Sequence, residues 1–262
     1  MILFDSHAHY YDEKFGDEGN RHQVISDVLS FGVKYVINAG TNPETTRQAI
    51  SLAEKYDGFY ASAGLHPSDI YDINNIDTAF DEIVSLAAHK KVVAIGEIGL
   101  DYHWHEDNKE LQKYWFSRQM ELAEKLSLPV IIHDREAHGD CIDIVLKYPN
   151  VKGVFHSFSG SRETAAELVK RGWYISFSGV ITFKNASRLA EIVPTIPNDR
   201  LLIETDCPYL TPHPFRGQIN SSVYMKYTAE KIAELRNTTV EEICNLTLKN
   251  AARLFSKTDI SF

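Results

Sequence analysis

Several features that often reveal a protein's class are scarce in this chain of 262 residues. Cysteine occurs only three times, at widely separated positions, which disfavours a disulfide framework and a structural zinc site. No apolar run approaches the roughly 18 residues that a membrane helix requires, and the first residues do not resemble a signal peptide. The sequence therefore predicts a cytoplasmic protein with no membrane association.

An excess of basic residues is also missing, because 27 Lys and Arg stand against 36 Asp and Glu, a formal net charge of −9. A basic surface is the usual signature of proteins that coat nucleic acid or bind membranes, so both roles are disfavoured. An acidic enzyme that handles phosphate groups through metal ions is compatible with this charge, since the ions supply positive charge. No protein partner is evident, and we expect a monomer or a weak oligomer.

Linkers, repeats and biased segments are absent as well, which predicts a single domain over residues 1–262. What is present is an alternation of short apolar runs with amphipathic segments. The runs span residues 2–4, 33–39, 59–63, 92–95, 130–132, 154–155, 173–177 and 201–203. Short and nearly continuous apolar runs are typical of parallel strands that are buried on both faces.

Helix-start signals stand between the runs. Asn42 precedes Pro43, and Ser161 precedes an apolar stretch with helical spacing. Near the end of the chain, Thr239 and Glu242 have the spacing of a capping box. Eight strands that are each followed by a helix predict an α/β protein with a (β/α)8 TIM barrel. An open doubly wound sheet is the alternative, but neither of its glycine-rich nucleotide-binding motifs occurs.

Side chains that bind metals stand at the ends of five of these runs. His7 and His9 are two residues apart in an extended segment, so both imidazoles face the same side. The complete set comprises four imidazoles and two carboxylates: His7, His9, Glu97, His133, His156 and Asp206. All six would lie at the C-terminal mouth of a barrel, where active sites of this fold are built.

These donors favour ions such as Zn, Mn, Fe or Co over Ca, whose ligands are oxygen atoms. Six ligands exceed the needs of one tetrahedral ion, so we expect two divalent ions roughly 3.5–4 Å apart. A lone strand-end histidine is more often a hydrogen-bonded residue than a ligand, and the prediction rests on the six residues together. We expect one ion on His7, His9, Glu97 and Asp206, and the other on Glu97, His133 and His156. Asp206 and Glu97 are the predicted catalytic residues, with Asp206 accepting a proton from water.

Six motifs surround these residues. They are DSHAH (5–9), GLHP (64–67), GEIGLD (96–101), IH (132–133), FHSFSG (155–160) and ETDCP (204–208). In this order they resemble the TatD family of metal-dependent deoxyribonucleases, within the amidohydrolase superfamily. The resemblance runs nearly end to end and implies a TIM-barrel hydrolase that acts on DNA ends, usually as a 3′-to-5′ exonuclease with a divalent ion such as Mg, Mn or Zn. It also implies that the six residues are the metal positions.

One segment departs from the family pattern. After residues 211–217 the family commonly continues with a basic residue and Asn-Glu-Pro, whereas this chain reads QINSS from Gln218 to Ser222. Arg216 and Asn220 match the pattern, while the basic residue, Glu and Pro are missing. The departure affects the transfer of substrate preference more than that of the metal site.

Residues close to the predicted ligands are candidates for substrate contacts: His66, Arg135, Arg216, Tyr102 and His103. His66 is predicted to contact a ligand or a phosphate, and the two arginines to bind phosphates. Tyr102 and His103, with the adjacent Trp104, are predicted to stack on a terminal base. The alternatives are a backbone-bonded histidine, surface ion pairs and aromatic packing over the barrel rim.

Two further side-chain predictions follow from sequence context. Asp101 has the spacing to hydrogen-bond a ligand histidine and fix its tautomer. Four histidines in polar surroundings are expected to face solvent: His22, His89, His105 and His138.

Two other functions are compatible with a metal-binding barrel. One is an amidohydrolase or esterase that acts on a small molecule or an aminoacyl-tRNA, since one fold supports many reactions. The absence of an evident lysine after the fourth run, which could be carbamylated to bridge two metals, disfavours the amide hydrolases. The other is a non-catalytic metal-binding protein, which is disfavoured because structural sites are saturated by four ligands.

Overall fold

The computed structural model describes residues 2–104 and 106–260, so the predictions for Met1 and His105 lie outside the described residues. All strands belong to one parallel set whose spatial order follows the sequence from β1 to β8. The strands are β1 (Leu3–Ala8), β2 (Val33–Ala39), β3 (Phe59–Ala63), β4 (Val92–Asp101), β5 (Val130–Arg135), β6 (Gly153–Phe155), β7 (Tyr174–Phe177) and β8 (Leu201–Ile203). Sequential parallel order with intervening helices is the topology of the predicted (β/α)8 fold.

Helices connect the strands as the sequence predicts. They are α1 (Glu18–Phe31), α2 (Pro43–Lys55), α3 (Ile76–Leu86), α4 (Lys109–Leu126), α5 (His138–Val145), α6 (Arg162–Lys170), α7 (Ser187–Ile192), α8 (Met225–Arg236) and α9 (Val240–Leu254). Asn42 caps α2 through a capping box with Thr45, and Ser161 caps α6. At the start of α9, Glu242 accepts from the backbone N–H of Thr239 and donates its own N–H to the Thr239 hydroxyl. These predicted helix starts are confirmed.

The chain divides into two compact units, each with four strands. Among the described residues, the first unit holds 2–38, 156–253 and 260, and the second holds 39–104, 106–155 and 254–259. In the first unit β7 pairs with β8, Ala8 at the end of β1 bridges to Cys207 after β8, and β1 pairs with β2. In the second unit β3, β4, β5 and β6 pair in that order. The prediction of a single domain stays a prediction.

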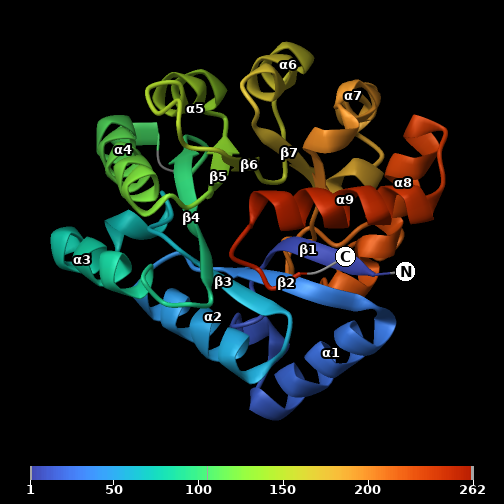
Figure 1. Cartoon of the computed structure of the whole chain (residues 1–262), viewed down its shortest axis with the longest axis horizontal. Coiled ribbons are helices and arrows are strands. Elements are labelled where there is room, and N and C mark those ends of the chain that lie inside the picture. The colour runs from blue at the N-terminus through green and yellow to red at the C-terminus, as the bar shows by residue number, and fades with distance from the viewer. Residues whose placement is uncertain (1, 105, 261–262) are drawn as a thin grey trace. The chain divides into compact units, whose positions relative to one another are not determined.

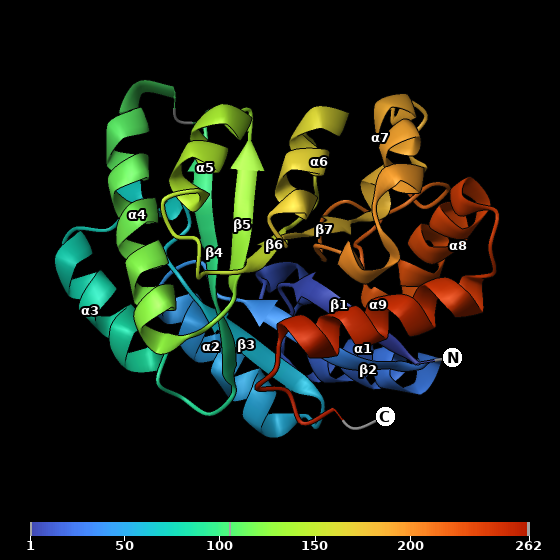
Figure 2. The same cartoon turned by 45° about the horizontal axis from the view of Figure 1, so that its top comes forward.

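Within the second unit, α4 packs against β4, as Figures 1 and 2 show. Every residue of β4 is buried. This strand is longer than the run at 92–95 predicts, because Gly99, Leu100 and Asp101 pair in register with His133, Asp134 and Arg135 of β5. Glu97 therefore lies inside β4 rather than after it. The sequence pattern ends early because Gly, Glu and Asp have low intrinsic preference for strands.

Candidate metal centre

His7 and His9 stand at the end of β1 and converge. Their Nε2 atoms are 3.0 Å apart, and both rings are buried. The Nδ1 of His9 is 2.8 Å from the hydroxyl of Tyr11. That bond occupies Nδ1 and leaves Nε2 directed at His7.

Asp206 reaches the same point from the loop after β8. The Asp206 N–H donates to the carbonyl of His7, and the His9 N–H donates to the carbonyl of Cys207. These two backbone bonds tie the loop to the end of β1. Asp206 has φ +57°, in the left-handed region that non-glycine residues seldom adopt and that is enriched at functional sites. Its Oδ1 lies 3.2 Å from His9 Nε2 and 3.5 Å from His7 Nε2.

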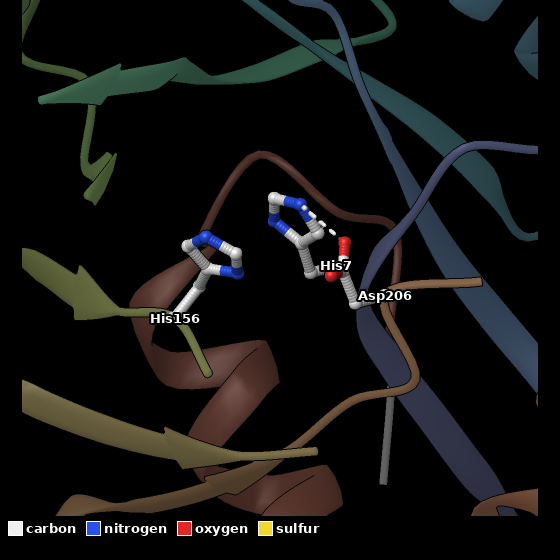
Figure 3. Close-up of side chains that lie close together, drawn as sticks. All are labelled: His7, His156 and Asp206. Carbon is white, nitrogen blue, oxygen red and sulfur yellow. Dashed lines mark ion pairs between the residues drawn. The ribbon is translucent and has the colours of Figure 1, made fainter. Parts of the chain in front are cut away.

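His156, just after β6, completes this group. Its ring stacks on that of His7 with centroids 4.0 Å apart, and Figure 3 shows the two rings facing one another beside the Asp206 carboxylate. His156 Nδ1 is 3.2 Å from Oε1 of Glu204, which also accepts the backbone N–H of Ser157 at 2.7 Å. Glu204 is fully buried. Because Nδ1 faces Glu204, Nε2 is the nitrogen of His156 that would bind a metal.

The donor atoms of this first-unit cluster fit a transition-metal ion. Ligands about 2.1 Å from one ion lie roughly 3.0–3.4 Å from each other, which is close to the spacing among His7, His9 and Asp206. Ligand atoms of His7, His156 and Asp206 lie within 4.8 Å of one another. A second partner on the other ring nitrogen is typical of metal-binding histidines, and His9 and His156 both have one.

Electrostatics in this cluster keep Asp206 ionised. Burial would raise the pKa of Asp206, but the hydrogen bond from His9 and the charges of His7, His9 and His156 hold it below its ordinary value. An ionised carboxylate next to imidazoles is both a metal ligand and a proton acceptor.

The second unit contains a separate cluster, formed by His66, Glu97 and His133, with ligand atoms within 4.8 Å of one another. His133 Nδ1 lies 2.9 Å from Glu97 Oε1, and His66 Nε2 lies 3.3 Å from the same oxygen. Glu97 is only 4% exposed, so its carboxylate is shielded from water and faces these two histidines. The His133 nitrogen and the Glu97 carboxylate are donors that suit a divalent transition metal.

Asp101 fixes the orientation of His133, as the sequence predicts. Its Oδ2 is 3.1 Å from His133 Nε2, while its Oδ1 accepts the backbone N–H groups of His103 and Trp104, each at 3.0 Å. Burial alone would raise the pKa of Asp101, but the hydrogen bond and charge of His133 and the two backbone donors lower it to about 2. An ionised Asp101 accepts the Nε2–H of His133, so the ring presents Nδ1 toward Glu97.

His66 differs from His133 in its tautomer. Its Nδ1 accepts the backbone N–H of Ser68 at 3.1 Å, so the proton of the neutral ring lies on Nε2. Nε2 faces Glu97 and acts as a hydrogen-bond donor rather than as a metal ligand. His66 therefore contacts Glu97, a candidate ligand, while its contact with a phosphate stays a prediction.

Gly99 determines how closely β4 and β5 approach beside this cluster. A Cβ atom at this position would lie 1.9 Å from the carbonyl oxygen of His133, and the residue has φ +143°. No side chain is compatible with both conditions. The second glycine of the GEIGLD motif is therefore a requirement of the β4–β5 contact at His133, a candidate ligand.

The predicted substrate contacts lie in different settings. Tyr102 donates its hydroxyl to Asp140, and His103 pairs with Glu136. Arg216 lies on an exposed part of the loop after β8, with its guanidinium 3.8 Å from the ring centroid of Phe183. Arg135 is exposed at the end of β5. Contact of these residues with substrate stays a prediction.

The segment that departs from the family pattern serves the loop after β8. The Asn220 side chain donates to the carbonyls of Thr205 and Tyr209, and the Ser222 hydroxyl donates to Asp5. Burial of Asp5 raises its pKa to about 7, although Ser222 and Thr205, on the same loop, both donate to this carboxylate. The residues at 220 and 222 therefore support the turn that carries Asp206.

Sequence reasoning missed two partners of the ligand histidines. Glu204 stands in the ETDCP motif but was assigned no role, and Tyr11 lies two residues after His9. Their spacing from ligand residues was the available signal. Of the histidines expected to face solvent, His89 lies 3.3 Å from Glu54, His138 lies 2.8 Å from Asp134, and both are half-buried.

Comparisons with known proteins find relatives along nearly the whole chain. The family model described as TatD related DNase matches residues 4–256. The chain belongs to the TatD family. It is 47% identical to the uncharacterized metal-dependent hydrolase YabD of Bacillus subtilis over 97% of this chain and 99% of that protein. It is 37% identical to the uncharacterized metal-dependent hydrolase YcfH of Escherichia coli, over 97% of this chain and 96% of that protein.

A solved structure places this TatD family member in the same fold. The crystal structure of the TatD homologue YJJV from Escherichia coli superposes with a TM-score of 0.90 at 30% identity, covering 97% of this chain and 98% of that chain. The TIM-barrel fold and the family resemblance are confirmed, and the protein is a metal-dependent hydrolase. In residues 2–104 and 106–260, no helix is long and apolar enough to cross a bilayer.

Proposed function

We propose that this TatD family hydrolase is a deoxyribonuclease that removes nucleotides from DNA ends, in the 3′-to-5′ direction. The observation that carries the proposal is the convergence of two imidazole nitrogens and the Asp206 carboxylate within 3.0–3.5 Å. The description of the family as DNases supports DNA as the substrate. DNA ends are the expected partner, and a cytoplasmic location and a monomeric or weakly oligomeric state stay predictions.

The proposed ligands come from both units. In the first unit they are His7, His9, His156 and Asp206, and in the second they are Glu97 and His133. The partners of the opposite ring nitrogens of His9, His156 and His133 support this assignment. Two divalent ions, Mg, Mn, Zn or similar, are proposed, and the bridging role of Glu97 stays a prediction.

Each residue has a defined task in phosphodiester hydrolysis. Divalent ions, when bound, lower the pKa of water and neutralise charge on phosphoryl oxygens. Asp206, ionised by its imidazole neighbours, accepts a proton from the attacking water at a carboxylate oxygen. His66 donates a hydrogen bond from its Nε2–H to an oxygen of the substrate, and Arg135 and Arg216 bind phosphates.

The test compares three substrate classes with purified protein. End-labelled single-stranded DNA, a carboxylic ester and a dihydropyrimidine-type amide are incubated with and without EDTA, and Mg, Mn or Zn is then restored. We expect stepwise loss of 3′ nucleotides that EDTA abolishes and the metal restores. His133→Ala removes the activity, while the matched control His89→Ala, whose ring pairs with Glu54 in the same unit, retains it.

Each other outcome points to a different function. Turnover of the ester or the amide with intact DNA would replace the proposal with a small-molecule hydrolase. Metal binding without turnover of any substrate would favour a non-catalytic protein. Shortening of DNA from the 5′ end would retain the deoxyribonuclease and reverse its direction.

A further inference from the structure

Trp104 is an unusual residue for the rim of a polar site. Its side chain is 67% exposed, whereas Trp115 and Trp173 are 3% and 2% exposed. It follows β4 on the loop that Asp101 holds through its Oδ1 atom. The other oxygen of Asp101 bonds His133, so Trp104 is placed three residues from the partner of a proposed ligand. An exposed indole at this position offers a flat apolar face on the loop that follows the strand of Glu97.

Arg135 lies beside this indole. Its guanidinium carbon is 5.7 Å from the centroid of the Trp104 ring, and its carbonyl accepts the N–H of Tyr102, which fixes the two segments together. The His103 ring makes an edge contact with the indole at 4.7 Å. Trp104 is therefore held by a cation and by its neighbour rather than covered by apolar side chains.

The charge of Arg135 has no counter-ion among the described residues. Of its two acidic sequence neighbours, Asp134 pairs with His138 and Glu136 pairs with His103. The surface ion pair that would explain Arg135 on structural grounds is therefore not made. An arginine without an acidic partner, in a protein of net charge −9, is suited to an anionic ligand.

We propose that Trp104 and Arg135 form a binding site for an unpaired nucleobase and its phosphate at the end of the DNA substrate. The base stacks on the indole, and the guanidinium binds a phosphate oxygen. A base inside a duplex has both faces covered, so this site selects single-stranded or frayed ends. The inference rests on the proposed deoxyribonuclease function and adds the feature of the substrate that is recognised.

The experiment uses two single-stranded oligonucleotides that differ only in the terminal nucleotide, which carries a base in one and is abasic in the other. For the wild-type protein we expect kcat/KM to be about tenfold lower for the abasic substrate. In Trp104→Ala this discrimination falls below about twofold, and in Trp104→Phe most of it is retained because a ring remains. Tyr114→Ala, which removes another exposed aromatic of the same unit, leaves it unchanged.

Fluorescence gives a second readout that does not depend on turnover. A single-stranded oligonucleotide with phosphorothioate linkages, which resist cleavage, quenches the emission of the exposed Trp104 in the wild type, and Trp104→Phe abolishes the change. Arg135→Ala weakens binding of both oligonucleotides equally and makes it less dependent on salt, because a phosphate contact is lost.

The outcomes separate the two proposals. If DNA is cut and Trp104→Ala discriminates between the substrates as the wild type does, the base site is wrong and the deoxyribonuclease stands. If no variant cuts DNA under any metal, both proposals fail. Because Trp104 is exposed, its substitution leaves the midpoint of thermal unfolding unchanged, and a lowered midpoint with equal loss on both substrates would indicate a structural role.

Discussion

The two units of the molecule each contain a histidine–carboxylate cluster, but they expose them differently. In the first unit His7, His9 and His156 are no more than 7% exposed, and their partners Tyr11 and Glu204 are side chains with no other proposed role. In the second unit His133 is half-buried, and its partner Asp101 also holds the loop with Trp104. Under the proposed function, we expect the first cluster mainly to hold an ion and the second also to contact the substrate.

The largest expected effect is in the first unit. Asp206→Asn removes the charge that accepts a proton and binds an ion, while the shape of the side chain is retained. We expect kcat for DNA hydrolysis to fall about 10²–10⁴-fold. Asp199→Asn, at an exposed ion pair with Arg200 in the same unit, is the control and retains full activity. Full hydrolysis by Asp206→Asn with normal metal binding would show that another group is the base.

The second prediction concerns the scaffold of the second unit. Gly99→Ala places a methyl group against the carbonyl of His133, and we expect a loss of about 3 kcal/mol or more in the free energy of unfolding. Gly139→Ala is the matched control, because a Cβ there meets nothing within 4 Å and the residue lies in α5. It is expected to be neutral or to stabilise by about 0.5–1 kcal/mol. Urea denaturation of both variants measures the difference, and equal stabilities would contradict the close β4–β5 contact.

The third prediction tests the comparison directly. Glu204→Ala in the first unit and Asp101→Asn in the second each weaken metal binding about 10–100-fold, because each releases a ligand histidine. In Asp101→Asn an amide N–H group and the His133 Nε2–H are two donors that face each other. The hydrogen bond from the Trp104 backbone N–H to residue 101 is also weakened, because the acceptor no longer carries a charge. Competition with a chromogenic chelator measures the ion affinity, and acrylamide quenching measures the exposure of Trp104. Quenching changes only in Asp101→Asn; an equal change in Glu204→Ala would remove the distinction between the units.

The smallest expected effect is a pH dependence at the edge of the second unit. The Lys113 ammonium and the Tyr102 hydroxyl lower the pKa of Asp140, so this carboxylate contributes stability above its unfolded pKa of about 3.9. That contribution is lost as the pH falls through the lower folded pKa. The group is half-buried at the surface, so Asp140→Asn costs well under about 1 kcal/mol at neutral pH. Denaturation at pH 7 and pH 3 checks the sign, since the variant and the wild type converge at the lower pH.

The fold was predictable because its strands are short apolar runs with helix caps between them. The ranges at 33–39, 59–63 and 201–203 match β2, β3 and β8. The prediction ended β4 too early, because Glu97, Gly99 and Asp101 lack strand preference and are held in the strand by pairing with β5. Local pattern cannot reveal a register that is set by a neighbouring strand.

The candidate ligands were predictable from their positions at strand ends, but their ring orientations were not. The sequence does not reveal that Asp101 bonds Nε2 of His133 while Ser68 donates to Nδ1 of His66. Those bonds depend on the path of the loops after β3 and β4, which no periodic signal encodes. Glu204 was overlooked because a buried acid next to a ligand has the same appearance in sequence as one that faces solvent.

The contact at Gly99 has a consequence for how this protein can acquire new substrates. The two strands meet there with no room for even a methyl group. A substitution at this position would therefore displace His133 of β5 before any new substrate contact could form. Trp104, five residues later, is 67% exposed, and we expect its substitution to be tolerated. In natural or laboratory evolution we therefore expect substitutions on the Trp104 loop and none at Gly99. Substrate specificity would change while the arrangement of the candidate ligands stays the same.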